Sequence, residues 1–141
     1  MATWRSMRDD NLRAAKLLAE DFPRSGASRA YYAVYAACCD VLESRSVPKT
    51  WHGRSRAWWY PHAELADLLE GLAEKYEQYG EPLLPPDQLS DLCGRIERLK
   101  NARVQADYVP ATPLEAADMQ DCLRDAVAVI NLLADVFEVE Q

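Results

Sequence analysis

The hydrophobic pattern of the chain is strongest between residues 28 and 42, in the stretch SRAYYAVYAACCDVL. No charged residue and no helix breaker lies between Arg29 and Asp40. Apolar residues recur every three or four positions, and the opposite side is also small or apolar, which predicts a helix buried on several sides. At about 15 residues it is too short to span a bilayer, which takes about 20. We expect it to be the central helix of a bundle, preceded by Pro23 and Gly26 and capped by Ser25 or Ser28.

Four further stretches have apolar residues on one helical face and charged residues on the other. They lie at residues 3–21, after Pro61, from about Pro86 and from Thr112. The last has the clearest start, with Thr112 as N-cap, Pro113 at the first helical position and Glu115 closing a capping box. Residues 48–60 are expected to form a loop turning at Gly53, and no stretch has the pattern of a strand. The sequence predicts an all-α, up-and-down bundle of about five helices in one domain, residues 1–141.

Composition is that of a globular protein, with 49% hydrophobic and 28% charged residues among 141. The N-terminus lacks the pattern of a signal peptide, so a cytoplasmic location and no membrane partner are expected. The four cysteines form no Cys-x-x-Cys pair, which argues against zinc and favours small core residues. His52 and His62 lack further ligands for a metal pair, so we expect neither a metal nor another cofactor.

The net charge of −7 argues against a protein that coats nucleic acid generally. The charge is uneven, however, because no acidic residue lies between Ser44 and Ala63. This stretch is rich in basic and aromatic residues: Arg45, Lys49, Arg54, Arg56, Trp51, Trp58, Trp59 and Tyr60. The tryptophans could stack on bases, as in proteins that bind single strands. A loop that covers the bundle or forms a dimer contact is the more ordinary use of such residues.

The apolar stripe of the fourth helix breaks at Arg103, where the next inward-facing residue is expected. A buried guanidinium needs a partner. It could pair with Asp107 one turn later or with a carboxylate of a neighbouring helix, which is the more ordinary arrangement. It could instead line a cleft and bind phosphate, which suits its planar fork. Similarly, Tyr31, Tyr32 and Tyr35 could offer hydroxyls to a nucleotide, although tyrosines on a buried helix are more often core.

Three segments together resemble the HEPN domain, a small helical domain of prokaryotic toxin–antitoxin and defence systems. They are AAKLLAEDFPRSGASRAYYAVYAAC at residues 14–38, WHGR at 51–54, and RLKNARVQADY at 98–108 leading into TPLEAADMQDCLRDA. The resemblance spans essentially the whole chain. It implies a dimerising bundle of four to five helices. In active members, two copies of an Arg-x(4–6)-His motif meet in a shared cleft that cleaves RNA without metal.

The resemblance places the arginine of that motif on Arg103 and its histidine on Tyr108, with Val104 where a polar residue often follows the arginine. A tyrosine, with an ordinary pKa of about 10, is a poor base near neutral pH. His52 and His62 could replace the histidine only if their segment folds over the cleft. The Arg-x-x-Ala-Asp-Tyr form also resembles one branch of the family, so the question of enzymatic activity stays open.

The resemblance implies a component of a toxin–antitoxin or defence module that binds RNA or a nucleotide in a dimer cleft, with metal-independent ribonuclease activity as one possibility. Arg103 and Tyr108 are the expected catalytic residues. The expected substrate-binding residues are Arg98, Lys100, Asp107 and Arg54. The alternative is a non-catalytic interaction module that binds a cognate nucleotidyltransferase or antitoxin protein. In that case Arg103 would form an internal salt bridge.

Overall fold

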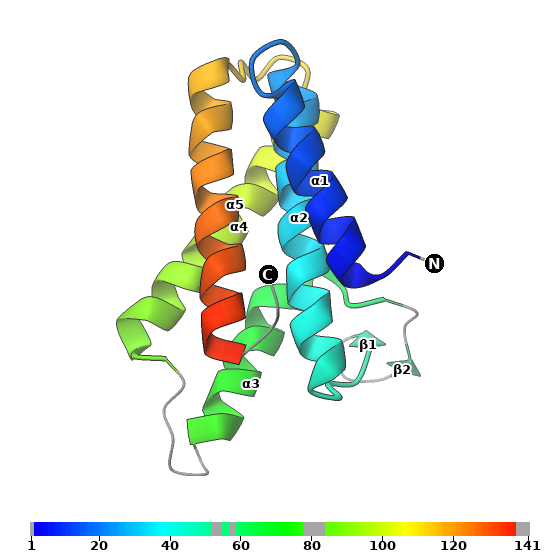
Figure 1. Ribbon diagram of the computed structural model, residues 1–141, viewed down its shortest axis with the longest axis vertical. Coiled ribbons are helices and arrows are strands. Elements are labelled where there is room, and N and C mark those ends of the chain that lie inside the picture. Colours follow the sequence, from blue (N-terminus) through cyan, green and yellow to red (C-terminus); the bar gives the residue numbers. More distant parts are fainter. Residues whose placement is uncertain (1, 52–54, 57–58, 78–83, 138–141) are drawn as a thin grey trace.

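The computed structural model describes residues 2–51, 55–56, 59–77 and 84–137, and within these it is an all-α bundle of five helices (Figure 1). The all-α prediction is therefore confirmed. The helices are α1 (Trp4–Leu18), α2 (Pro23–Ser44), α3 (Leu65–Glu77), α4 (Pro86–Tyr108) and α5 (Ala116–Phe137). A short 3-10 helix, η1 (His62–Glu64), leads into α3.

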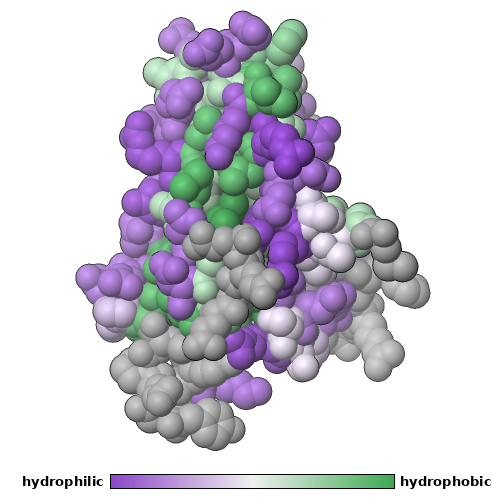
Figure 2. Space-filling model, in the orientation of Figure 1, coloured by the Kyte–Doolittle hydropathy of each residue, from purple (hydrophilic) through white to green (hydrophobic). Residues whose placement is uncertain are grey.

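Helix α2 is the centre of the bundle and packs against each of the other four helices. Thirteen of its 22 residues are buried, from Gly26 to Leu42, which confirms the prediction of a helix covered on several sides. Its alanines and its cysteines Cys38 and Cys39 are core residues, and all four cysteines of the chain are free thiols. Figure 2 shows hydrophobic side chains gathered along the seam between α5 and the α1–α2 pair, while polar side chains cover the outer surfaces.

The start of α2 differs from the prediction. The helix begins at Pro23 rather than at a serine cap, and Gly26 lies inside it. Proline suits the first helical position because its fixed φ is already helical. Gly26 allows close packing, since a Cβ there would lie 2.8 Å from the Met119 sulfur of α5. Neither predicted serine caps the helix, and Ser28 is instead hydrogen bonded to α4.

A minimal antiparallel hairpin replaces part of the predicted loop. Its strands, β1 (Thr50–Trp51) and β2 (Ser55–Arg56), pair Thr50 with Arg56 and Trp51 with Ser55. Two residues a strand are too few to show the alternation that marks a strand in a sequence. The expected turn at Gly53 lies outside the described residues.

Helix α5 begins at Ala116, later than the predicted capping box. The Thr112 hydroxyl is not the cap, because it lies 2.6 Å from the side-chain oxygen of Gln105 on α4 and hydrogen bonds to it. Asp118 serves the helix start instead, accepting the Glu115 N–H at 3.0 Å. The Glu115–Asp118 hydrogen bond therefore replaces the predicted capping box of Thr112 and Glu115, because the helix begins at Ala116.

The C-terminal end of α4 is held by Arg24 of α2. Its guanidinium donates to the carbonyl oxygens of Thr112 at 2.7 Å, Gln105 at 3.2 Å, and Val109. Carbonyls at a helix C-terminus lack partners within the helix, and a cation is favourable there. Arg24 therefore fixes the last turns of α4, the part of the helix that carries Arg103.

Candidate functional site

Arg103 continues the buried face of α4 formed by Leu92, Ile96 and Leu99. Its guanidinium carbon lies 5.3 Å from the ring centre of Tyr31, 5.8 Å from that of Tyr32 and 5.9 Å from that of Tyr108. These distances are within the range of cation–π contacts. Arg103 therefore lies against the tyrosines of α2, where the break in the apolar stripe predicted an inward or cleft-facing cation.

No carboxylate among the described residues forms an ion pair with Arg103. The expected partner, Asp107, instead accepts a hydrogen bond from the Ser28 hydroxyl at 3.2 Å. The Nε atom of Arg103 is buried and has no hydrogen-bond partner. A buried N–H without an acceptor costs free energy, and cation–π contacts do not supply the missing acceptor. An anionic oxygen that reached this atom would be strongly favoured.

His62 joins the same group of side chains. Its Nδ1 atom lies 2.6 Å from the Tyr31 hydroxyl, and its ring stacks on Tyr35 with centres 4.2 Å apart. Two bonds attach its segment to the bundle: the Tyr35 hydroxyl donates to the Tyr60 carbonyl, and the Tyr60 hydroxyl donates to the Val47 carbonyl, both at 2.6 Å. The segment preceding α3 therefore folds over α2. A fold-over of this segment was the condition for His62 to replace the histidine of the motif.

The shifted pKa values of His62 and Tyr31 keep both side chains uncharged at neutral pH. Burial lowers the pKa of His62, and the positive charges of Arg103 and Lys100 lower it further. Burial raises the pKa of the Tyr31 hydroxyl, with Arg103 acting in the opposite direction. At neutral pH His62 is therefore neutral and Tyr31 protonated, so the charge next to His62 is positive and comes from α4.

Not all of the other predicted site residues lie beside Arg103. Tyr108 contacts Arg103 with a largely exposed side chain, and Lys100 is near enough to affect His62 although it pairs with Glu97 at 3.0 Å. Arg98 points toward α5 and pairs with Asp125 at 3.2 Å, so it does not join Arg103. Arg54 lies outside the described residues.

The sequence interpretation underrated Tyr31, Tyr32 and His62. The tyrosines were assigned to the core, and Tyr31 is fully buried, but both also face Arg103. No sequence signal places them beside Arg103, because the contact between this face of α2 and the end of α4 is seen only in the structure. No local pattern marks His62.

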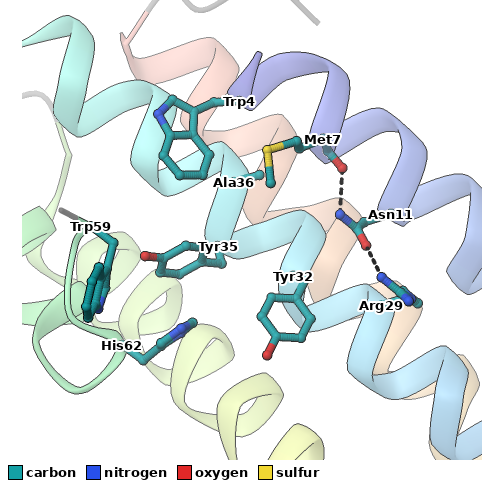
Figure 3. A pocket seen from close by; sticks show the side chains of 9 residues that line it. All are labelled: Trp4, Met7, Asn11, Arg29, Tyr32, Tyr35, Ala36, Trp59 and His62. Carbon is teal, nitrogen blue, oxygen red and sulfur yellow. Dashed lines mark hydrogen bonds between the residues drawn. The ribbon is translucent and has the colours of Figure 1, made fainter. Parts of the chain in front are cut away.

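A cavity of about 490 Å³ lies beside this group, between α1, α2 and the segment before α3 (Figure 3). Tyr32 and His62 belong to both the cavity and the Arg103 group. The remaining lining residues are Trp4, Met7, Asn11, Arg29, Tyr35, Ala36 and Trp59. Aromatic side chains therefore form most of the wall, and none of the lining residues is acidic.

Comparisons with known proteins add no relative: no protein-family model matches the chain, and no curated protein matches it. Within the described ranges, no three His, Cys, Asp or Glu side chains are placed to hold a metal ion. No helix in that part of the chain is both long and apolar enough to cross a membrane. The candidate site thus consists of Arg103, Tyr31, Tyr32, Tyr108 and His62, with the aromatic cavity beside it.

Proposed function

We propose that this chain is a HEPN-like component of a prokaryotic toxin–antitoxin or defence module, and that it binds the phosphate of RNA or of a nucleotide at Arg103. The observation that carries the proposal is the buried Nε of Arg103, which has no hydrogen-bond partner and no paired carboxylate. The other arginines of α4 have such partners: both Arg95 and Arg98 are paired with Asp125. A phosphate oxygen that approaches the Arg103 guanidinium would gain charge-assisted hydrogen bonds for which no described carboxylate competes.

Metal-independent cleavage of RNA is the enzymatic form of this proposal. The 2′-oxygen would attack the adjacent phosphorus and lose its proton to His62, while the 5′-oxygen would leave and take a proton from water. Neutral His62 is the group in the site best suited to accept a proton near neutral pH. Arg103 would stabilise the negative charge that develops on the phosphoryl oxygens. His62 would thereby take the proton-accepting role for which Tyr108, at the position that the resemblance gives to the motif histidine, is poorly suited.

The decisive experiment measures binding and cleavage of a labelled single-stranded RNA by the purified chain in the presence of a chelator. We expect Arg103→Ala to weaken binding at least tenfold and to abolish any cleavage, and Tyr108→Phe to weaken cleavage. Arg98→Ala is the matched control, because it removes an arginine from the same helix whose partner is Asp125. RNA and nucleotide affinity that Arg103→Ala leaves unchanged would contradict the proposal.

We also propose that the chain forms a homodimer whose cleft contains Arg103, and light scattering on the same sample tests this. A strictly monomeric protein that binds no RNA or nucleotide would leave the alternative, a non-catalytic module for a partner such as a nucleotidyltransferase or antitoxin protein. Exposed Leu17 and Phe22 at the junction of α1 and α2, 77% and 62% accessible, are the surface that favours such a partner. In that case Arg103→Ala would lower the melting temperature, and neither the variant nor the wild type would bind RNA or a nucleotide.

A further inference from the structure

The cavity beside Arg103 has the features of a binding site for one nucleobase. We propose that it holds the base of the ligand, with Arg29 in its wall and Arg103 beside the Tyr32 ring providing positive charge for its phosphates; this inference rests on the proposed function. The ligand class is a purine or pyrimidine carrying a phosphate, either as a free nucleotide or as one residue of a single-stranded RNA. A volume of about 490 Å³ lies within the usual range for small-molecule pockets.

The walls are suited to stacking. Figure 3 shows Trp59 and His62 at one end of the cavity and Arg29 with Asn11 at the other, with Tyr32 and Tyr35 between them. One face of Tyr35 is already covered by His62, whereas Trp59 is half exposed. A half-exposed tryptophan beside a cavity can stack on a base without disturbing the core.

The charge distribution favours a ligand that is both aromatic and anionic. Arg29 donates to the Asn11 amide oxygen at 3.3 Å, and no carboxylate among the described residues pairs with it. The nearest acid to the lining residues in the hydrogen-bond network is Glu43, which accepts from the Trp4 indole and is paired with Lys49. Arg29 in the wall and Arg103 near the Tyr32 ring, neither paired with a described carboxylate, favour an anionic ligand over a neutral or cationic one.

Polar groups are also available for the edge of a base. The Tyr32 hydroxyl takes part in none of the hydrogen bonds found among the described residues, and its ring lies edge-on to His62. The Nδ1 atom of His62 is bonded to the Tyr31 hydroxyl, and this bond leaves the other ring nitrogen, Nε2, for a ligand. A few polar groups in an otherwise aromatic wall are typical of sites that orient a planar ligand.

The test is calorimetric titration of the full chain with the four ribonucleoside 5′-monophosphates, adenosine, inorganic phosphate and a single-stranded RNA hexamer. We expect at least one nucleotide or the hexamer to bind, and Trp59→Ala to weaken that binding about tenfold, as loss of one stacking partner does. Arg29→Gln should weaken the phosphate-bearing ligand more than adenosine. Phe22→Ala and Arg124→Gln, which remove an exposed aromatic ring and an exposed cation elsewhere, are the matched controls and should bind normally.

The outcomes separate this inference from the proposed function. Binding lost in Arg103→Ala but unchanged in Trp59→Ala and Arg29→Gln would overturn the base site alone. Binding lost in Trp59→Ala and Arg29→Gln but unchanged in Arg103→Ala would support the base site and overturn the phosphate site at Arg103. Absence of binding to every probe would overturn both. Binding of the hexamer but of no monophosphate would identify RNA, not a free nucleotide, as the source of the base.

Discussion

The two faces of α4 use arginine in opposite ways. On the face toward α5, Arg95 donates to Asp91 at 2.9 Å and to Asp125 at 2.8 Å, and Arg98 reaches Asp125 as well. On the face toward α2, Arg103 lies among tyrosine rings, and its Nε has no acceptor. The same residue type on one helix thus pairs with carboxylates on one side and, among the described residues, pairs with none on the other.

This difference separates arginines that stabilise the fold from one that is available to a ligand. An arginine whose donors are occupied by carboxylates has little to gain from an external anion. An arginine held in place by aromatic rings keeps its geometry while its donors stay unused. The α4–α5 face is therefore structural, and the α2–α4 face is the candidate for anion binding.

The largest effect is expected from Arg24 of α2, which holds the end of α4 and the segment that follows it. Arg24→Met removes its hydrogen bonds to the carbonyls of Gln105, Val109 and Thr112, which stay part-buried without that donor. Because hydrogen bonds from charged groups are worth about 1.5–3 kcal/mol each and do not add fully, we expect a loss of about 3 kcal/mol in the free energy of unfolding. Urea denaturation measures it, and a loss below about 1 kcal/mol would show that Arg24 does not hold α4.

Removing Asp125, the carboxylate that Arg95 and Arg98 share, should weaken the contact between α4 and α5. Asp125→Asn leaves Arg95 and Arg98 without their common partner, and Asp125 is only 15% exposed. We expect a loss of about 1.5 kcal/mol in the free energy of unfolding, more than for an exposed pair. Affinity for RNA or nucleotide should be unchanged in the same variant. A change in that affinity without a change in stability would reverse the assignment of the two faces.

On the face of α4 toward α2 we expect the opposite result, a loss of ligand binding with little change in stability. Arg103→Met removes the cation–π contacts but also the buried N–H without an acceptor, so the free energy of unfolding should stay within about 1 kcal/mol of the wild type. Thermal stabilisation by a bound nucleotide or RNA should disappear in this variant. A strong loss of stability in the absence of ligand would make Arg103 a structural residue like Arg95.

A smaller effect concerns His62, whose folded-state pKa is below the ordinary value of about 6.5. Below pH 6.5 the unfolded chain therefore binds more protons at this residue than the folded chain does. Stability is lost as the pH falls through 6.5 toward the folded-state pKa. We expect the free energy of unfolding to decrease less between pH 8 and pH 5.5 in His62→Gln than in the wild type. Equal decreases in the two proteins would contradict a half-buried His62 that is neutral in the folded chain.

The sequence was most informative where the information is local. The periodicity of α2 predicted its burial, and the break in the stripe of α4 predicted that Arg103 faces inward or into a cleft. It was less informative at the ends of elements. Pro23 and Gly26 look like a turn, yet Gly26 belongs to α2 because its missing Cβ leaves room for Met119 of α5. A partner so distant in the sequence leaves no mark in the local pattern.

By itself, then, the sequence determined the five helices, the central place of α2 and the position of a lone cation on the buried face of α4, because helical periodicity encodes which side of each element avoids water. Only the tertiary structure decided what that cation meets. Asp107 is one turn from Arg103 and was the obvious partner, but it is bonded to Ser28. His62 carries no local signal, yet the tyrosine bonds of its segment place it against Tyr31. Contacts between distant segments depend on how all the helices pack together, and this is where the candidate site arises.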